Sequence, residues 1–192
     1  MKVFQKIIEK NESVFSGELA KSLNEKFDLE DHEDLSILIR LAYTQYVLDE
    51  KEIASQLSSL ISDIKFTGNH DIWTWVKSAL VLRSYIYNEK GQSELSKNCI
   101  EKINFALSKD KPINQKAFQR VLNGSLLNYD KIENAKDENA EYGWRLVQLQ
   151  KLILIHEMGG GDEFSVERAE KEIQENIERL KTLINEFNQT LR

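Results

Sequence analysis

The apolar residues of this chain recur at steps of three and four, which is the period of an α-helix and not of a β-strand. One such run contains Leu35, Leu38, Ile39, Ala42, Tyr43 and Tyr46. The same spacing predicts further helices over 51–66, 71–90, 93–107, 144–155 and 166–191. We therefore expect an all-α fold.

Residues that begin or end helices lie between these segments. Asp31 is placed to cap the first helix and Ser165 the last one, because both side chains can accept hydrogen bonds from free backbone amides. Gly68 is expected to end the second helix in a left-handed cap. Pro112 stops the helix over 93–107, since proline cannot continue a helix.

Two of the predicted helices indicate how they pack. The helix over 71–90 has one apolar stripe through Trp73 and Val76 and another through Trp75 and Ala79. A helix that is apolar on two sides is buried between neighbours. The stripe of the last helix averages about 3.6 residues per turn, which favours packing on the body of the protein over an extended coiled coil.

The region between Pro112 and Tyr142 has a weaker pattern. A short helix is expected around Phe118, and Asn123 and Gly124 indicate a break. We interpret the chain as a single all-helical domain over 1–192, with an internal linker at 130–141. The glycines at 159–161 precede no Gly-Lys-Ser or Gly-Lys-Thr sequence, so they predict a flexible connection between helices rather than a phosphate loop.

The segment from Trp73 to Pro112 is the clearest structural unit. It contains a helix that begins with a large residue, a turn at Gly91, a second helix and a closing proline. This pattern resembles a tetratricopeptide repeat. The tripeptide at 157–159 echoes the one at 89–91 about 68 residues earlier, which is twice the roughly 34-residue period of that family. The resemblance implies antiparallel helical hairpins, either in a solenoid-like stack or in an irregular bundle, and a role in binding peptides or proteins.

Composition supports this interpretation. The 192 residues include only eight Gly and one Pro, fewer than the turns of a β-sheet protein require. The net charge of −6 is unfavourable for binding nucleic acid, whose affinity comes from neutralised phosphates. Residues 1–96 hold 11 basic and 16 acidic groups, whereas residues 97–192 hold 15 basic and 16 acidic groups. A basic partner therefore suits the first half of the chain better.

The sequence also indicates a compartment. Cys99 is the single cysteine, so no intramolecular disulfide can form. The densest apolar stretch, over 146–155, is far shorter than the roughly 20 residues that cross a bilayer. The segment from Met1 to Lys10 mixes charged and apolar residues and lacks the continuous apolar run of a signal peptide. We expect a cytoplasmic protein that binds no membrane.

Histidines are the first candidates for chemistry. His70 and Asp71, with His32 upstream, resemble the metal-binding arrangement of HD-family phosphohydrolases, which implies a metal-dependent hydrolase. The alternative is that Asn69 or Asp71 satisfies free amides at the start of a helix. We favour this alternative, and with it a binding protein over an enzyme, without metal or other cofactor.

Aromatic residues are the candidates for binding. Tyr43, Tyr46, Trp73 and Trp75 lie on helices that should pack together. They are either core residues or, where one faces a groove between hairpins, anchors for a partner. The leading hypothesis is a module that binds a protein or peptide. Its size and charge also suit a small immunity or antitoxin-like protein.

Overall fold

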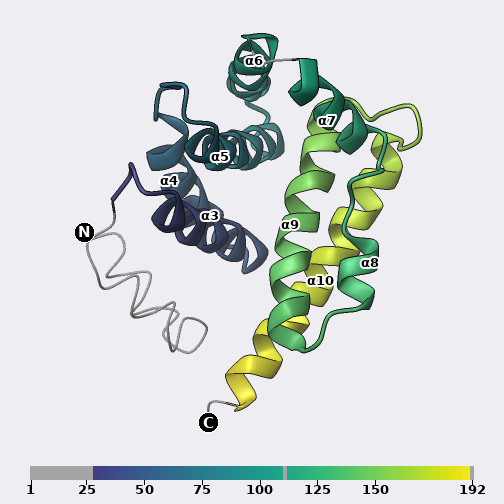
Figure 1. Cartoon of the computed structure of the whole chain (residues 1–192). Helices are drawn as coiled ribbons and strands as arrows, with labels where there is room; N and C mark the ends of the chain where they lie inside the picture. Colours follow the sequence, from purple (N-terminus) through teal and green to yellow (C-terminus); the bar gives the residue numbers. More distant parts are fainter. Residues whose placement is uncertain (1–27, 110–111, 191–192) are drawn as a thin grey trace.

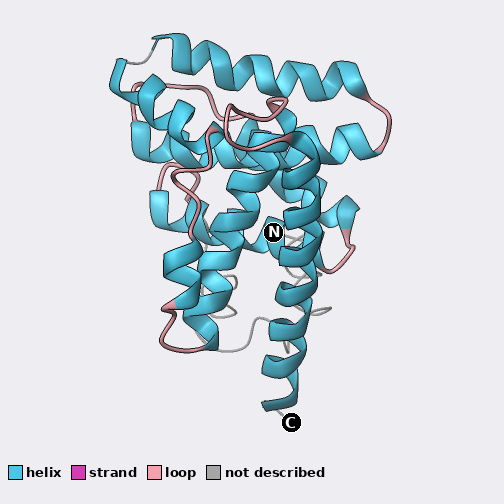
Figure 2. Ribbon diagram, turned by 90° about the vertical axis from the view of Figure 1, so that its right-hand side faces the viewer, coloured by secondary structure: helices cyan, strands magenta, loops and turns pink. Residues whose placement is uncertain are grey.

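The computed structural model describes residues 28–109 and 112–190, and this part of the chain is all-α (Figure 1, Figure 2). It contains no β-strand, only an isolated bridge between Gly161 and Phe164. The fold class predicted from periodicity is confirmed. The segment Met1 to Lys10 lies outside the described residues. The helices are α3 (His32–Val47), α4 (Lys51–Ser62), α5 (His70–Glu89), α6 (Ser93–Lys109), α7 (Pro112–Leu122), α8 (Tyr129–Glu133), α9 (Glu138–Glu157) and α10 (Val166–Thr190).

The described helices pack as hairpins around α5. α3 packs on α4, α5 on α6 and α9 on α10, and α5 also contacts α3, α4 and α9. Figure 1 shows α3 to α6 on one side and α7 to α10 on the other. Trp73 and Val76 of one α5 stripe and Ala79 of the other are buried, as the two-stripe pattern predicts. α7 and α8 intervene along the chain between the second hairpin and the last one, and the result is an all-α bundle.

Three hairpin turns share one backbone geometry. Asp49, Gly91 and Gly159 each follow a helix end with a positive φ, of 63°, 70° and 80°. In each turn the amide of the next residue donates to the carbonyl five positions earlier, over 2.8–2.9 Å. This bond defines the Schellman motif. The sequence echo between 89–91 and 157–159 therefore marks equivalent turns.

The second helix ends earlier than its pattern predicts. α4 stops at Ser62, with Asp63 as its C-terminal cap, and does not continue to Phe66. Gly68 has a φ of 97° in the following loop and caps no helix end. Ile64 and Phe66 pack against the core from that loop. Because these two loop residues continue the helical spacing of α4, the sequence predicts a longer helix than the structure has.

Side-chain caps mark the starts of α3, α9 and α10. Asp31 accepts α3 amides at 2.8 and 3.0 Å, and Ser165 accepts an α10 amide at 3.2 Å, as predicted. α9 begins before the expected start near Trp144, because Asp137 accepts an α9 amide at 2.8 Å. The segment 130–141, interpreted as a linker, therefore contains most of α8 and the first turn of α9.

The stripe of α10 lies in the core. Ala169, Ile173, Leu180 and Ile184 are at most 1% exposed, which confirms that this helix packs on the body of the protein. α10 contacts α9 along its length and reaches α3 as well. None of the described helices is long and apolar enough to cross a membrane.

The connection between α9 and α10 is held by close packing, although its glycines predict a flexible spacer. Phe164 inserts its ring into the core and is 2% exposed. A methyl group added at Gly161 would overlap the backbone carbonyl of Leu122 at the end of α7. The glycine is therefore required by close contact between two backbone segments.

Candidate functional site

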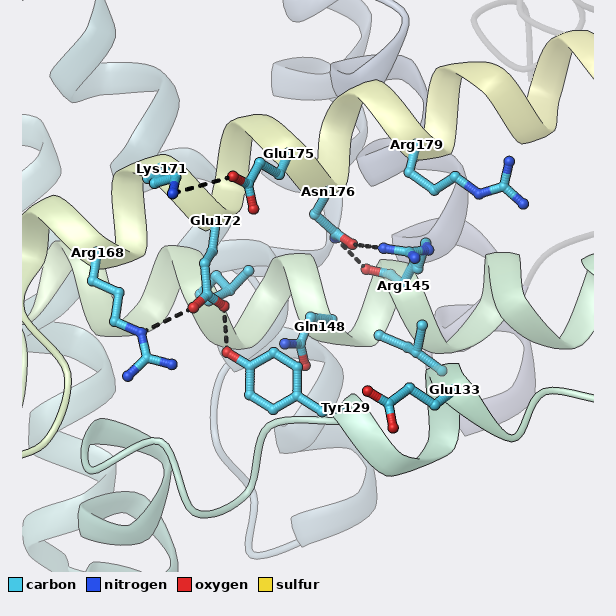
Figure 3. A pocket seen from close by; sticks show the side chains of 12 residues that line it. Tyr129, Glu133, Arg145, Gln148, Arg168, Lys171, Glu172, Glu175, Asn176 and Arg179 are labelled. Carbon is cyan, nitrogen blue, oxygen red and sulfur yellow. Dashed lines mark hydrogen bonds and ion pairs between the residues drawn. The ribbon is translucent and has the colours of Figure 1, made fainter.

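An open groove of about 770 Å³ lies between α8, α9 and α10 (Figure 3). α8 forms one wall and α10 the other, and α9 contributes the floor. Its volume falls in the range of about 300–1,000 Å³ that is typical of ligand sites. The lining residues are Tyr129, Ile132, Glu133, Arg145, Gln148, Leu152, Arg168, Lys171, Glu172, Glu175, Asn176 and Arg179.

The floor of the groove, where α9 meets α10, contains two buried side-chain amides, Gln148 of α9 and Asn176 of α10. Asn176 is 4% exposed and Gln148 is 3% exposed. Asn176 Nδ2 donates to the Arg145 carbonyl at 2.8 Å, and its Oδ1 accepts from Arg145 Nη1 at 3.2 Å (Figure 3). Gln148 Oε1 accepts from the backbone N–H of Asn128 at 2.5 Å. Because buried polar groups are costly unless hydrogen-bonded, these contacts fix the floor in one arrangement.

Two arginines of the lining share one carboxylate. Glu141 accepts from Arg145 Nε at 2.6 Å and from Arg179 Nε and Nη2 at 2.9 and 2.8 Å. Hydrogen bonds from Arg179 and then from Arg145 lower the pKa of Glu141 to about 2. The carboxylate therefore stays ionised and holds both guanidinium groups at one end of the groove.

The α8 wall is joined to the α10 wall by a hydrogen bond across the groove. The Tyr129 hydroxyl of α8 donates to Glu172 Oε2, and Arg168 Nε donates to Glu172 Oε1 at 3.0 Å (Figure 3). Burial, followed by the contact with Glu172, raises the pKa of Tyr129. The tyrosine therefore remains a neutral donor. These bonds set the width of the groove between the two helices.

The lining suits binding through charges and hydrogen bonds. It has four basic side chains and three acidic ones, and it includes neither histidine, cysteine nor serine. Some of the charges pair with one another, as Lys171 does with Glu175 at 3.6 Å. Charged groups already held in position can recognise complementary charges without first being ordered.

The aromatic residues singled out from the sequence lie elsewhere. Tyr43 and Tyr46 are buried where α3 meets α5. Trp73 is buried beside Phe66 of the loop after α4, and Trp75 packs partly buried against the same core. The Tyr43 hydroxyl donates to the Ser78 carbonyl at 3.1 Å. None of the four lines the groove, and a binding role for them stays a prediction.

The histidine arrangement is explained by helix capping. His70 begins α5, and Asn69 Oδ1 accepts from the amides of Asp71 and Ile72 at 3.0 and 3.2 Å. His32 is the first residue of α3. Within residues 28–109 and 112–190, no three His, Cys, Asp or Glu side chains are grouped so that they could hold a metal ion. The described residues therefore supply no centre of the HD type.

A second polar cluster, which the sequence does not reveal, surrounds Glu157 at the end of α9. Its side chain is fully buried and accepts from Ser84, from Asn88 Nδ2 at 2.6 Å and from Ser96 at 3.2 Å. His156 Nδ1 lies 3.1 Å from its other oxygen, and that contact raises the pKa of His156. Burial, the largest single effect, raises the pKa of Glu157, but the hydrogen bonds from His156, Ser84 and Asn88 together outweigh it and lower the pKa. This cluster joins α5, α6 and α9.

Fold and groove together define an all-α bundle with an open, charged groove on its last two long helices. The model of the family of unknown function DUF6707 matches residues 1–182. The chain therefore belongs to this family, and every residue that lines the groove falls within the matched part. No curated protein matches the chain, and no solved structure does.

Proposed function

We propose that this chain is a non-enzymatic binding protein, and that the groove between α8 and α10 holds an extended segment of a peptide or of another protein. The observation that carries the proposal is the groove itself, open to solvent and lined by charged side chains above a floor of buried, hydrogen-bonded amides. Protein binding is also the role that the helical hairpins favour.

The length of the groove suits a peptide. Its α10 wall extends from Arg168 to Arg179, which corresponds to about 16 Å at a helical rise of 1.5 Å per residue. An extended chain rises about 3.3 Å per residue, so about five residues would span this wall. A compact small molecule would contact only part of it.

The charges suit a segment that carries both signs. Arg168 and Lys171 stand near one end of the α10 wall, where they can bind acidic side chains. Glu133 and Glu175 can bind basic ones. Such contacts weaken as salt screens them. A wholly basic partner, which the charge of residues 1–96 favours, would meet a different surface.

The experiment is a selection of peptides from a random displayed library, followed by titration calorimetry with the full chain. We expect selected peptides to carry charges of both signs and to bind more weakly as salt increases. Lys171→Glu should weaken binding at least tenfold, because it reverses a charge on the groove wall.

Lys97→Glu on α6 is the matched control. Lys97 and Lys171 are both exposed, and each pairs with a glutamate four residues later. Lys97 does not line the groove. A peptide set that binds equally well to both variants and to the unmodified chain would refute the proposal.

A further inference from the structure

A second pocket, of about 260 Å³, lies between α5, α6, α7 and α9. Its walls are mainly apolar and include Val81 of α5, Ile103 of α6, Phe118 and Val121 of α7 and Leu154 of α9. α7 packs on α6 and α9, and the pocket lies between α7 and α5, partly open to solvent. Figure 1 shows α6 and α7 at the end of the bundle away from the C-terminus, and α9 running from there toward the C-terminal end.

The charged residues of this pocket have one sign. Lys77 of α5 and Lys151 of α9 line it, and its lining includes no Asp or Glu. Lys151 Nζ donates to the carbonyl of Leu126 and to Asn128 Oδ1, the latter at 2.9 Å. Both acceptors are neutral, so these bonds leave the charge of the ammonium group without a counter-charge.

The ammonium group of Lys151 is partly withdrawn from water. Burial is the main cause of its lowered pKa, with a contribution from Lys131. A cation beside apolar walls interacts with an anion more strongly than a cation in water does. The chain as a whole has a net charge of −6, so a pocket lined by basic groups alone differs in sign from the rest of the molecule.

We propose that this pocket binds a small molecule with an apolar body and one carboxylate, the body packed against Val81, Phe118 and Val121 and the carboxylate directed to Lys77 and Lys151. The volume equals about nine times the roughly 30 Å³ that one water occupies. The ligand should therefore have about nine non-hydrogen atoms, as a medium-length fatty acid does. This site is separate from the groove between α8 and α10.

The test uses octanoate as the probe, with 1-octanol and octylammonium as ligands of the same length and different charge. Binding to the full chain is measured by titration calorimetry and located by amide chemical shifts in NMR spectra. We expect octanoate to bind at least tenfold more tightly than either comparison ligand and to shift the amides of Val81, Val121 and Leu126.

Three variants separate charge from volume. Lys77→Met and Lys151→Met should each weaken octanoate binding about tenfold and leave octanol binding unchanged, because the apolar stem of the side chain is kept. Ala117→Phe should reduce the binding of both ligands, since Ala117 is an exposed residue of the pocket lining. Lys97→Met, on α6 and outside the pocket, is the control and should change neither.

If Lys151→Met lowers the melting temperature, Lys77→Met and Ala117→Phe decide the question. Equal affinity for octanoate and octanol would overturn the proposal, and so would the absence of saturable octanoate binding. Octanoate shifts confined to α8 and α10 would overturn it too, and would assign the anion to the groove of the proposed function instead. Loss of peptide binding in the groove would not affect this result.

Discussion

The carboxylate of Glu141 on α9 and the guanidinium group of Arg179 on α10 meet edge to edge, with Nε–Oε1 and Nη2–Oε2 distances of 2.9 and 2.8 Å. Such a paired geometry restricts orientation as well as distance. Arg145, one turn after Glu141 along α9, donates to the same carboxylate. The pair therefore fixes the angle between the two helices that form the floor and one wall of the groove.

This pair should make stability depend on pH. Because the folded pKa of Glu141 is about 2, its contribution is present above about pH 4.5 and is lost as the pH falls toward 2. We expect Glu141→Gln to cost about 1–2 kcal/mol at pH 7, less than the full shift implies because Arg179 is partly exposed. Urea unfolding at several pH values measures this. Glu138→Gln in the same helical turn is the control, and an equal loss there would contradict the prediction.

The buried Glu157 should control the titration of His156. Since their contact raises the pKa of His156, Glu157→Gln should lower it, which an NMR titration of the ring protons measures. In the unmodified chain the stabilising effect of the raised His156 pKa is lost as pH rises through that pKa, and the effect of the lowered Glu157 pKa is lost in acid. An unchanged His156 titration in the variant would show that the carboxylate does not act on the ring.

Removal of the Glu157 side chain should destabilise the fold. Glu157→Ala leaves Ser84, Asn88 and Ser96 without their buried acceptor, and we expect a loss of about 2–4 kcal/mol in the free energy of unfolding. Glu89→Ala is the comparison, because Glu89 stands at the equivalent turn of α5 and is partly exposed. Glu89→Ala should lose less free energy of unfolding than Glu157→Ala. Chemical denaturation of both variants measures the two losses.

The hairpin turn at Asp49 should be improved by glycine. Asp49 has a φ of 63°, where a side chain costs roughly 1–2 kcal/mol. Part of this gain is offset by the greater freedom of glycine in the unfolded chain, so we expect Asp49→Gly to stabilise by up to about 1 kcal/mol. Gly91→Ala, at the matching turn of the next hairpin, should destabilise by a similar amount. Thermal melting of both variants checks the opposite signs.

Two glycines of the last hairpin should respond oppositely to alanine. Gly161→Ala would force apart the backbones at 161 and at Leu122, and we expect a loss of at least about 2 kcal/mol, within the range for overpacking. Gly143 lies inside α9 with open space around it, so Gly143→Ala should stabilise by about 0.5–1 kcal/mol. Equal melting temperatures for the two variants would contradict the assigned contact.

The sequence predicts the long helices because their apolar stripes bury against one another. The stripe from Ala169 to Ile184 is an example, and each of its predicted core positions is buried. Prediction from the spacing of apolar residues fails where a loop residue continues the helical spacing, as Ile64 and Phe66 do after α4. It also fails in the region of α8, where a five-residue helix leaves no period to detect.

The groove could not be predicted in the same way. Its residues come from three helices, and each is an ordinary surface residue when seen alone. The one local signal is the spacing of Arg168, Lys171, Glu172, Glu175 and Arg179 along one face of the last helix. The aromatic residues stand out more clearly in the sequence than the groove residues do. Tyr43 and Trp73, however, are aromatic because they fill the core.

The central position of α5 has a consequence for how the molecule opens. Since α5 contacts α3, α4, α6 and α9, each of these helices can separate from it while the other contacts remain. The stretch of α5 from Val76 to Ile86, which holds most of the buried residues of this helix, can exchange its amide hydrogens with solvent only when all of these contacts are lost. Its hydrogen exchange should therefore report global unfolding, whereas the short α8 exchanges through local opening.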